Sequence, residues 1–444
     1  MTHMSDVKLA LVRALIEQAP DAVIQSLSLA LSSDRKHDES LTQVHQMVDA
    51  EAVDRRARNL VFSPVAPLCA IPGPFSGLNF PPRALSMLWK ALKQQAPEKA
   101  IAAKALSRRW GGPDSSPELF DQLCAMAAEG IRRGEGPFEA AATAADQGGG
   151  RASFAACLDI APVTRRALDQ MPEWLGRMTS EKAAKLRLAY RDAVGVSDDA
   201  GPRFFEMLAA HLAEPWLILR IISGVMDRPN EAYVSGSELA GFGERVLADI
   251  ERRLGEVTAF KATAGRQAAN AAAQAVHLAT TEIAELEQSF GLTPDGAWGR
   301  RLARQKKTLA ATIETHLKAT DAAVAQALPL QTVRVGPRTQ RGVPRLTHEP
   351  DLAQVEKAAT LLTFMSEVRS SATAGGFASA RAKALEGLEQ RLDTYVEEVL
   401  ADIHADDGVD PVRAKAFLEI AAQFCGLARD EKSAQIVRRR AAAA

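Results

Sequence analysis

The chain has 444 residues, of which 47% are hydrophobic, 25% charged and only 5% aromatic. This length exceeds what one hydrophobic core usually supports, so we expect two or three domains. The formal net charge of -1 excludes a general electrostatic field that would draw the protein to nucleic acid or to an anionic membrane. The sequence is rich in alanine, leucine, arginine and glutamate, which favour helix, so we expect an all-α protein.

The N-terminal part, residues 5–227, is expected to form one helical domain. Stretches of helix-forming residues follow one another there, separated by proline, glycine or polar turns. They lie at about 6–32 with a break at Pro20, and at about 40–62, 82–109, 117–133, 137–146, 153–194 and 202–225. Short helices joined by short turns are typical of an irregular helical bundle.

Residues 63–82 interrupt this pattern with six prolines among leucine, isoleucine and phenylalanine residues. Neither a helix nor a central strand tolerates so many prolines, so we expect an apolar loop. Loops are normally polar, so an apolar one must lie against something. One alternative is that it packs along its own domain. The other is that it docks onto a partner through Phe75 and Phe80, with Cys69 at the same contact.

A polar stretch at 228–236 marks the main boundary, and a long helical hairpin is expected after it, over residues 237–328. No proline occurs from 237 to 290, and apolar residues recur there at the three- and four-residue steps that are typical of heptads. A turn with glycine and proline at 291–296 then begins a second helix. The sequence therefore predicts two long antiparallel helices resembling a coiled coil.

The two helices of this hairpin have complementary stripes when they run antiparallel. The register that pairs their apolar positions sets Ala272 opposite Ile313. In the same register three acidic residues lie beside three basic ones: Glu282, Glu285 and Glu287 beside Arg300, Arg301 and Arg304. Opposite charges at such positions support the pairing. We therefore expect cysteines placed at 272 and 313 to crosslink.

Residues 329–349 are expected to form a flexible basic loop, and residues 350–437 a set of C-terminal helices that pack on the hairpin. No acidic residue occurs between Gln331 and His348. The loop carries four arginines: Arg334, Arg338, Arg341 and Arg345. Their uncompensated charge predicts binding to phosphate groups or to an acidic protein surface. The alternative is a solvated loop without a ligand.

No motif in the sequence defines a catalytic, metal or cofactor site. The four cysteines include no C-x-x-C pair, and no two histidines have the i, i+4 spacing that holds a metal from one helix face. Glycine loops for nucleotides and nucleophile elbows are also missing. We therefore expect free, buried thiols and neither a cofactor nor a metal.

One segment, with Glu206, His211, Glu214 and Trp216, leaves open an enzyme whose site assembles from distant residues. The alternative there is a buried helix with a satisfied histidine.

These features favour a non-enzymatic scaffold or adaptor that binds protein partners and could also form homo-oligomers. The alternatives are an enzyme with its site in the N-terminal domain, and binding of an anionic ligand or nucleic acid through the arginine loop. Scarce aromatic residues and the neutral total charge count against nucleic acid. We expect no membrane span, because the most hydrophobic stretch, 204–226, contains charged residues. The sequence shows no secretory signal, so we expect a cytoplasmic protein.

Overall fold

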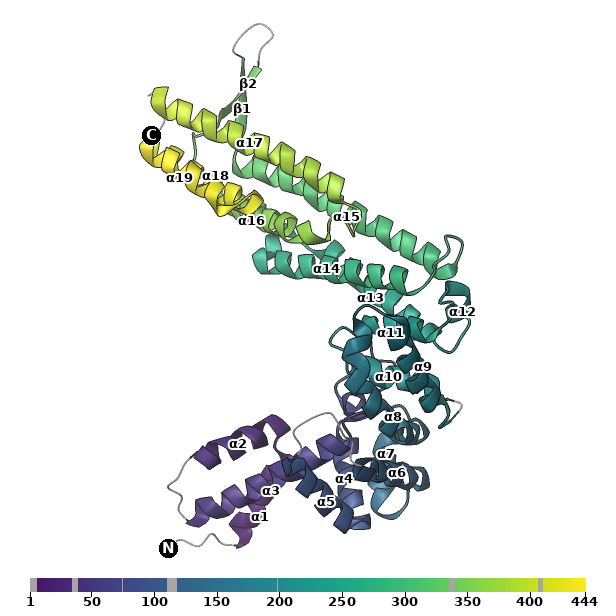
Figure 1. Ribbon diagram of the computed structural model, residues 1–444. Helices are drawn as coiled ribbons and strands as arrows, with labels where there is room; N and C mark the ends of the chain where they lie inside the picture. Colours follow the sequence, from purple (N-terminus) through teal and green to yellow (C-terminus); the bar gives the residue numbers. More distant parts are fainter. Residues whose placement is uncertain are drawn as a thin grey trace. The chain divides into compact units, whose positions relative to one another are not determined.

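The structure is a computed structural model that describes residues 6–33, 39–73, 75–109, 118–197, 199–334, 340–405 and 410–444. Across these ranges the protein is all-α and 80% helical, with 19 α-helices and a single two-stranded hairpin, which confirms the expected all-α class. The chain divides into two compact units, Met1–Arg228 and Pro229–Ala444, shown in Figure 1. Among the described residues no helix is both long enough and apolar enough to cross a membrane.

Unit 1 contains the first eleven α-helices in the described ranges. They are α1 (Asp6–Gln18), α2 (Asp21–Ser33), α3 (Glu39–Val61), α4 (Arg83–Gln95), α5 (Pro97–Arg109), α6 (Glu118–Arg133), α7 (Glu139–Asp146), α8 (Arg151–Leu175), α9 (Ser180–Val194), α10 (Ala200–Ala210) and α11 (Ile218–Val225). Three short 3-10 helices join them: η1 (Ala66–Cys69), η2 (Gly136–Phe138) and η3 (Pro215–Leu217).

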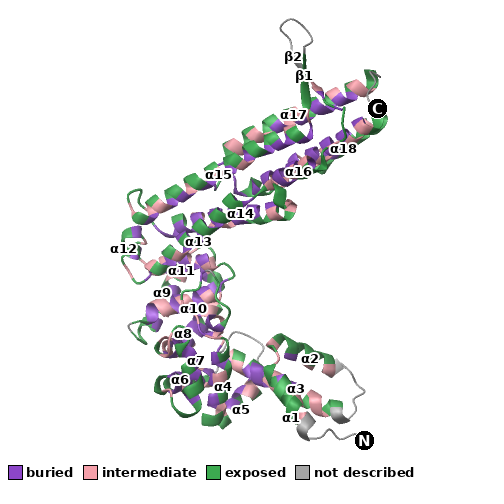
Figure 2. Cartoon of the chain, turned by 180° about the vertical axis from the view of Figure 1, so that it is seen from behind, coloured by how far each residue is buried: buried purple, intermediate pink, exposed green. Residues whose placement is uncertain are grey.

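The first three helices form a small layer in which α1 and α2 both pack on α3. Its buried core is thin and centres on Ile16, Ile24 and Val48. In Figure 2 these helices are mostly exposed or intermediate, whereas α6 to α8 carry many buried residues. The contrast follows from composition, since α6 and α8 bring phenylalanine and tryptophan side chains into a continuous core.

The proline-rich segment 63–82 packs against its own unit. Phe80 is fully buried, its ring lies 4.6 Å from that of Phe154 between centroids, and Phe75 is 8% exposed. The Phe80 backbone N–H donates to Leu68 O at 2.7 Å, and the Gly149 N–H donates to Asn79 O at 2.9 Å. Of the two alternatives for this loop, the structure shows packing along its own domain.

Unit 2 contains eight α-helices and two strands in the described ranges. They are α12 (Glu231–Ser235), α13 (Ala240–Ala259), α14 (Arg266–Ser289), α15 (Ala297–Ala327), β1 (Leu330–Arg334), β2 (Gln340–Pro344), α16 (Leu352–Glu367), α17 (Ala378–Ala405), α18 (Pro411–Ala428) and α19 (Glu431–Ala443), with the 3-10 helices η4 (Ala262–Ala264) and η5 (Val368–Ser371). Helices α14 and α15 both pack on α13 and α16, and α17 packs on α15 and α18.

The single long helix expected over 237–290 is two helices, α13 and α14, with a break at 260–265. Gly265 has φ of +82° there, a left-handed conformation that suits glycine. Phe260 leaves the helical path and stacks on Phe364 of α16, with ring centroids 5.1 Å apart. Because α13 folds back at this point, it packs on α14. We expected one long helix to pair directly with α15, with Ala272 opposite Ile313. Instead, α14 and α15 each pack on α13 and α16.

Residues 329–349, expected to be a loop, include an antiparallel β-hairpin. Strand β1 pairs with β2 in a register that sets Thr332 opposite Gly342 and Val333 opposite Arg341. The β-branched residues Thr332, Val333 and Val343 explain the strands, because such side chains favour the extended conformation. This hairpin contacts α17 through β2.

Candidate docking groove of the N-terminal helices

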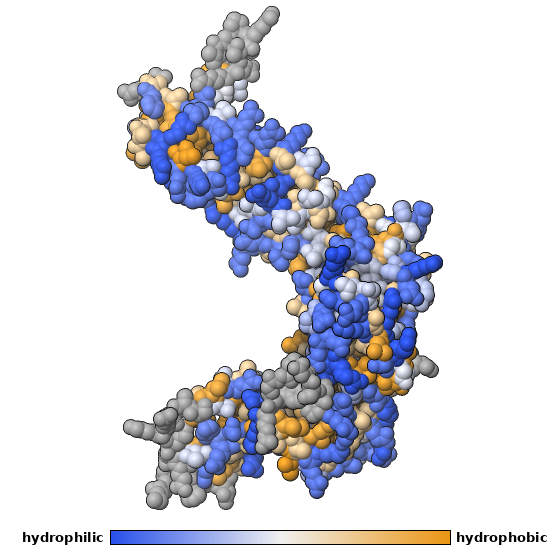
Figure 3. Space-filling model, viewed as in Figure 1, coloured by the Kyte–Doolittle hydropathy of each residue, from blue (hydrophilic) through white to orange (hydrophobic). Residues whose placement is uncertain are grey.

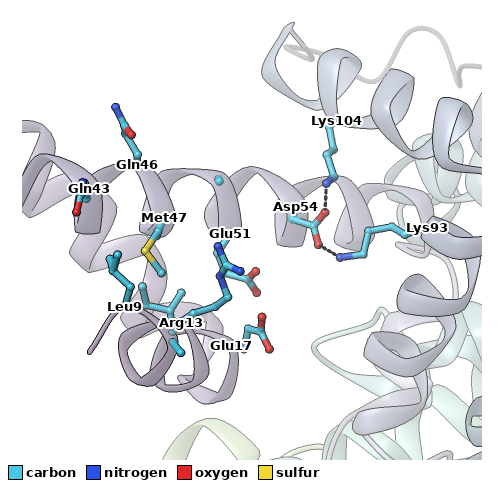
Figure 4. Close-up of a pocket in the computed structure, with 13 residues that line it drawn as sticks. Leu9, Arg13, Glu17, Gln43, Gln46, Met47, Glu51, Asp54, Lys93 and Lys104 are labelled. Carbon is cyan, nitrogen blue, oxygen red and sulfur yellow. Dashed lines mark hydrogen bonds and ion pairs between the residues drawn. The ribbon is translucent and has the colours of Figure 1, made fainter. Parts of the chain in front are cut away.

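Unit 1 contains an open groove of about 680 Å³ between α1 and α3, with α4 and α5 at one end (Figure 4). Helix α3 lines it with Gln43, Gln46, Met47, Ala50, Glu51 and Asp54, and α1 with Leu9, Ala10, Arg13, Ile16 and Glu17. Lys93 and Lys104 complete the lining. The lining thus combines apolar side chains with polar and charged ones.

The spacing of the α3 residues explains why they line one groove. Steps of three and four residues repeat from Gln43 to Asp54, and such steps place side chains on one face of a helix. The α1 residues Leu9, Arg13 and Ile16 repeat in the same way and form the facing wall. In Figure 4 Leu9 lies near Gln43 and Met47, and Glu17 lies toward the Asp54 end.

Asp54 forms the charged end of the groove and binds two lysines. The residue is 7% exposed, and its carboxylate accepts a hydrogen bond from Lys93 Nζ at 2.8 Å and from Trp89 Nε1 at 3.0 Å. Lys104 Nζ lies 2.5 Å from its other oxygen. Burial alone would raise the pKa of Asp54, but the hydrogen bonds from Lys104 and Lys93 outweigh it and hold this pKa below its ordinary value. Two cations thus share one buried anion.

Arg55 fixes the wall of the groove by closing the C-terminal end of α1. Its guanidinium donates to Ile16 O at 2.8 Å, to Glu17 O at 3.1 Å and to Ala19 O at 2.6 Å. It also donates to Glu51 Oε1 at 2.6 Å. The last carbonyl groups of a helix have no partner within the helix, and a cation there also suits the helix dipole. Arg55 therefore holds α1 at a defined distance from α3.

The outer faces of α1 and α2 expose large apolar side chains. Leu11 is 63% exposed, Leu15 61%, Val23 45% and Leu27 41%. Figure 3 shows hydrophobic residues at the surface over α2. Such a concentration beside a groove is typical of surfaces that bind proteins.

The arginines of the basic segment are described only in part. Arg338 lies outside the described residues. Arg334 ends β1 and Arg341 lies in β2, and only their backbone is described. Arg345 follows β2, is exposed and donates its backbone N–H to Pro329 O at 2.9 Å. Binding of anions by this segment stays a prediction.

The segment around His211, which left open an enzyme in unit 1, makes structural contacts within that unit. His211 follows the last residue of α10 as its C-cap, and its Nε2 lies 3.0 Å from Ser63 O. Burial lowers the pKa of His211 below its ordinary value, so the ring is neutral at pH 7. Trp216 is buried in η3 and Glu214 is exposed. The arrangement ties the C-terminal end of α10 to the start of the proline-rich segment.

The sequence did not predict the burial and the partners of two acidic residues in unit 2. Glu231 is 3% exposed and accepts backbone N–H groups of Trp298 at 2.7 Å and Thr293 at 3.1 Å, so it caps the N-terminal end of α15. Glu282 is fully buried and accepts from Arg253 Nε at 2.8 Å, in place of the expected arginines of α15. The partners are distant in sequence, so no local signal shows them. Lys306 does pair with Glu287, at 2.8 Å.

Within the described part of the chain no group of three histidine, cysteine, aspartate or glutamate side chains could hold a metal ion. The cysteines Cys69, Cys124, Cys157 and Cys425 are free and buried, as expected. Fold and pocket together define an all-α protein with an open groove on its N-terminal helices. Comparison with protein-family models, curated proteins and solved structures finds no match to this chain.

Proposed function

We propose that this protein is a non-enzymatic adaptor that binds a protein partner through its N-terminal helices, α1 to α3. The observation that carries the proposal is the open groove between α1 and α3, with a lining of apolar and charged side chains, beside exposed leucines of α1. A groove between helices is a common docking surface for a partner segment. We place this activity in the cytoplasm, where buried free thiols stay reduced.

The internal chemistry of unit 1 supports this proposal over an enzyme. The buried arginines of unit 1 bond to backbone groups at helix ends, as Arg55 does at α1. Arg165 does the same at α3, donating to Leu60 O and Val61 O at 2.7 Å each. Groups held in this way stabilise the fold, and this role accounts for their burial.

Photo-crosslinking of the full chain in the cells that make it tests the proposal. A photoreactive amino acid replaces Leu15, which is exposed on α1, and a control protein carries it at Lys318, which is exposed on α15. We expect a discrete crosslinked protein from position 15 and none from position 318. The double variant Leu11→Ser, Leu15→Ser should lose the same partner in copurification. Equal crosslinking at both positions would count against docking by the N-terminal helices.

A further inference from the structure

The groove between α1 and α3 has the dimensions of a seat for a short helix. Its α3 wall runs from Gln43 to Asp54, which is about 17 Å at 1.5 Å per residue. This length matches about three turns of a partner helix. Leu9, Met47 and Ala50 contribute apolar side chains to its lining. An amphipathic helix with apolar residues at three- and four-residue steps would bury these side chains.

The charges at the Asp54 end specify one feature of that helix. The Asp54 side chain is only 10% exposed, whereas those of Lys93 and Lys104 are 37% and 33% exposed. The carboxylate is therefore enclosed, and both ammonium groups reach solvent. Because one anion faces two cations, the cluster of Asp54, Lys93 and Lys104 carries one excess positive charge. Of the two other acidic residues in the lining, Glu51 is already paired with the buried Arg55, which leaves Glu17 on the α1 wall.

We propose that this groove binds an amphipathic helix of a partner protein, oriented so that an aspartate or glutamate of that helix reaches Lys93 and Lys104. The inference rests on the proposed adaptor function and adds the chemistry of the partner. The partner carboxylate forms an ion pair with both lysines at the groove end. Its apolar residues cover Leu9, Met47 and Ala50.

A photoreactive amino acid at Gln46, which is exposed in the groove, identifies the bound segment by mass spectrometry. The matched control is Gln25 of α2, which is also exposed and does not line the groove. The crosslinked segment, made as a labelled peptide, is then titrated with the full chain by fluorescence anisotropy. We expect an amphipathic helical peptide with an acidic residue. The double variant Lys93→Gln, Lys104→Gln should bind it about tenfold more weakly and lose most of the salt dependence.

Replacing the peptide's acidic residue by its amide should weaken binding to the parent protein and leave binding to the lysine variant unchanged. The lysine change could loosen the fold around Asp54, so a second variant is needed. Gln46→Trp fills the groove without touching Asp54 and should abolish binding, whereas Gln25→Trp should not. A bound segment without an acidic residue, or full affinity in the lysine variant, would overturn the inference while leaving the adaptor proposal standing. Crosslinking at Leu15 without crosslinking at Gln46 would also overturn the inference and leave the adaptor proposal standing. If no partner were crosslinked at either position, both the inference and the adaptor proposal would be refuted.

Discussion

Glu282 should make unit 2 less stable as the pH rises from 5 to 9. Its carboxyl is fully buried between α13 and α14, where Asp249 is only 6% exposed and Arg253 is the cation bonded to both acids. Burial, followed by the nearby charge of Asp249, raises the pKa of Glu282 from 4.5 to about 8, although Arg253 acts in the opposite direction. At neutral pH the folded protein therefore holds a proton on Glu282.

The sign of the effect follows from comparing the folded and unfolded states. Below pH 4.5 Glu282 is protonated in both states and its raised pKa has no effect on stability. As the pH rises above 4.5 the unfolded chain loses the proton first, so the free energy of unfolding falls until the folded carboxyl also ionises near pH 8. Each pKa unit is worth about 1.4 kcal/mol, so the loss reaches at most about 5 kcal/mol.

The variant Glu282→Gln removes this titration and keeps a side chain of similar shape. Its amide can accept from Arg253 and donate to Asp249. We expect it to be more stable than the parent by about 2–4 kcal/mol at pH 9 and nearly equal at pH 5. Urea-dependent hydrogen exchange, followed in peptides from α13 and α14 and corrected for intrinsic rates, measures the difference.

A matched control is Glu287→Gln on the same helix, since Glu287 is half-exposed in its ion pair with Lys306. Its removal should change stability by less than about 1 kcal/mol at either pH. If the difference between Glu282→Gln and the parent were the same at pH 5 and pH 9, the buried proton assigned to Glu282 would be refuted.

Three further substitutions test packing and capping. Glu231→Gln removes the charge that caps α15 and should destabilise unit 2 by about 2 kcal/mol, seen as reduced protection of the first turn of α15 in hydrogen exchange. Gly243→Ala places a Cβ 2.3 Å from the Trp298 ring and should lower the melting temperature, with a cost of about 1–3 kcal/mol. Arg55→Lys keeps the charge but loses the fork of donors at the end of α1, so hydrogen exchange should accelerate in α1 and α2 and not in α8.

Each of these substitutions has a control in the chain. Gly255 lies in the same helix as Gly243 and has open space around it, so Gly255→Ala should stabilise α13 by about 1 kcal/mol. Glu238→Gln, at an exposed residue, is the control for Glu231→Gln. Arg56→Lys, also at an exposed residue, is the control for Arg55→Lys. If Gly243→Ala were as well tolerated as Gly255→Ala, the close packing of Trp298 on α13 would be wrong.

The sequence predicts helices well here because composition and turn residues are local signals. The break at 260–265 was not predictable in this way, since Phe260 leaves the helix to stack on Phe364, a residue more than one hundred positions later. A small-residue stripe in α14 fits several neighbours equally well, so periodicity could not show that α13 would occupy that face. The strands β1 and β2 contain the β-branched residues Thr332, Val333 and Val343, a local signal for strand that was passed over because the arginines suggested a loop.

The groove was not predictable from the sequence for a similar reason. Spacing along α3 places Gln43 and Asp54 on one face, but it does not show which helix lies opposite. That depends on Arg55 reaching the carbonyl of Ile16, 39 positions earlier in the chain. The pairing of Asp54 with two lysines is likewise a tertiary contact, because Lys93 and Lys104 belong to α4 and α5.

The ion pairs of unit 1 differ in what they leave available to a partner. Arg55 and Arg165 are almost fully buried, and backbone carbonyls at the ends of α1 and α3 accept their hydrogen bonds. Such groups cannot reach a partner without opening the fold. Lys93 and Lys104 hold Asp54 from the solvent side, so each can bind a second anion without losing the first. A partner carboxylate would therefore gain attraction at the groove while the buried pair stays intact.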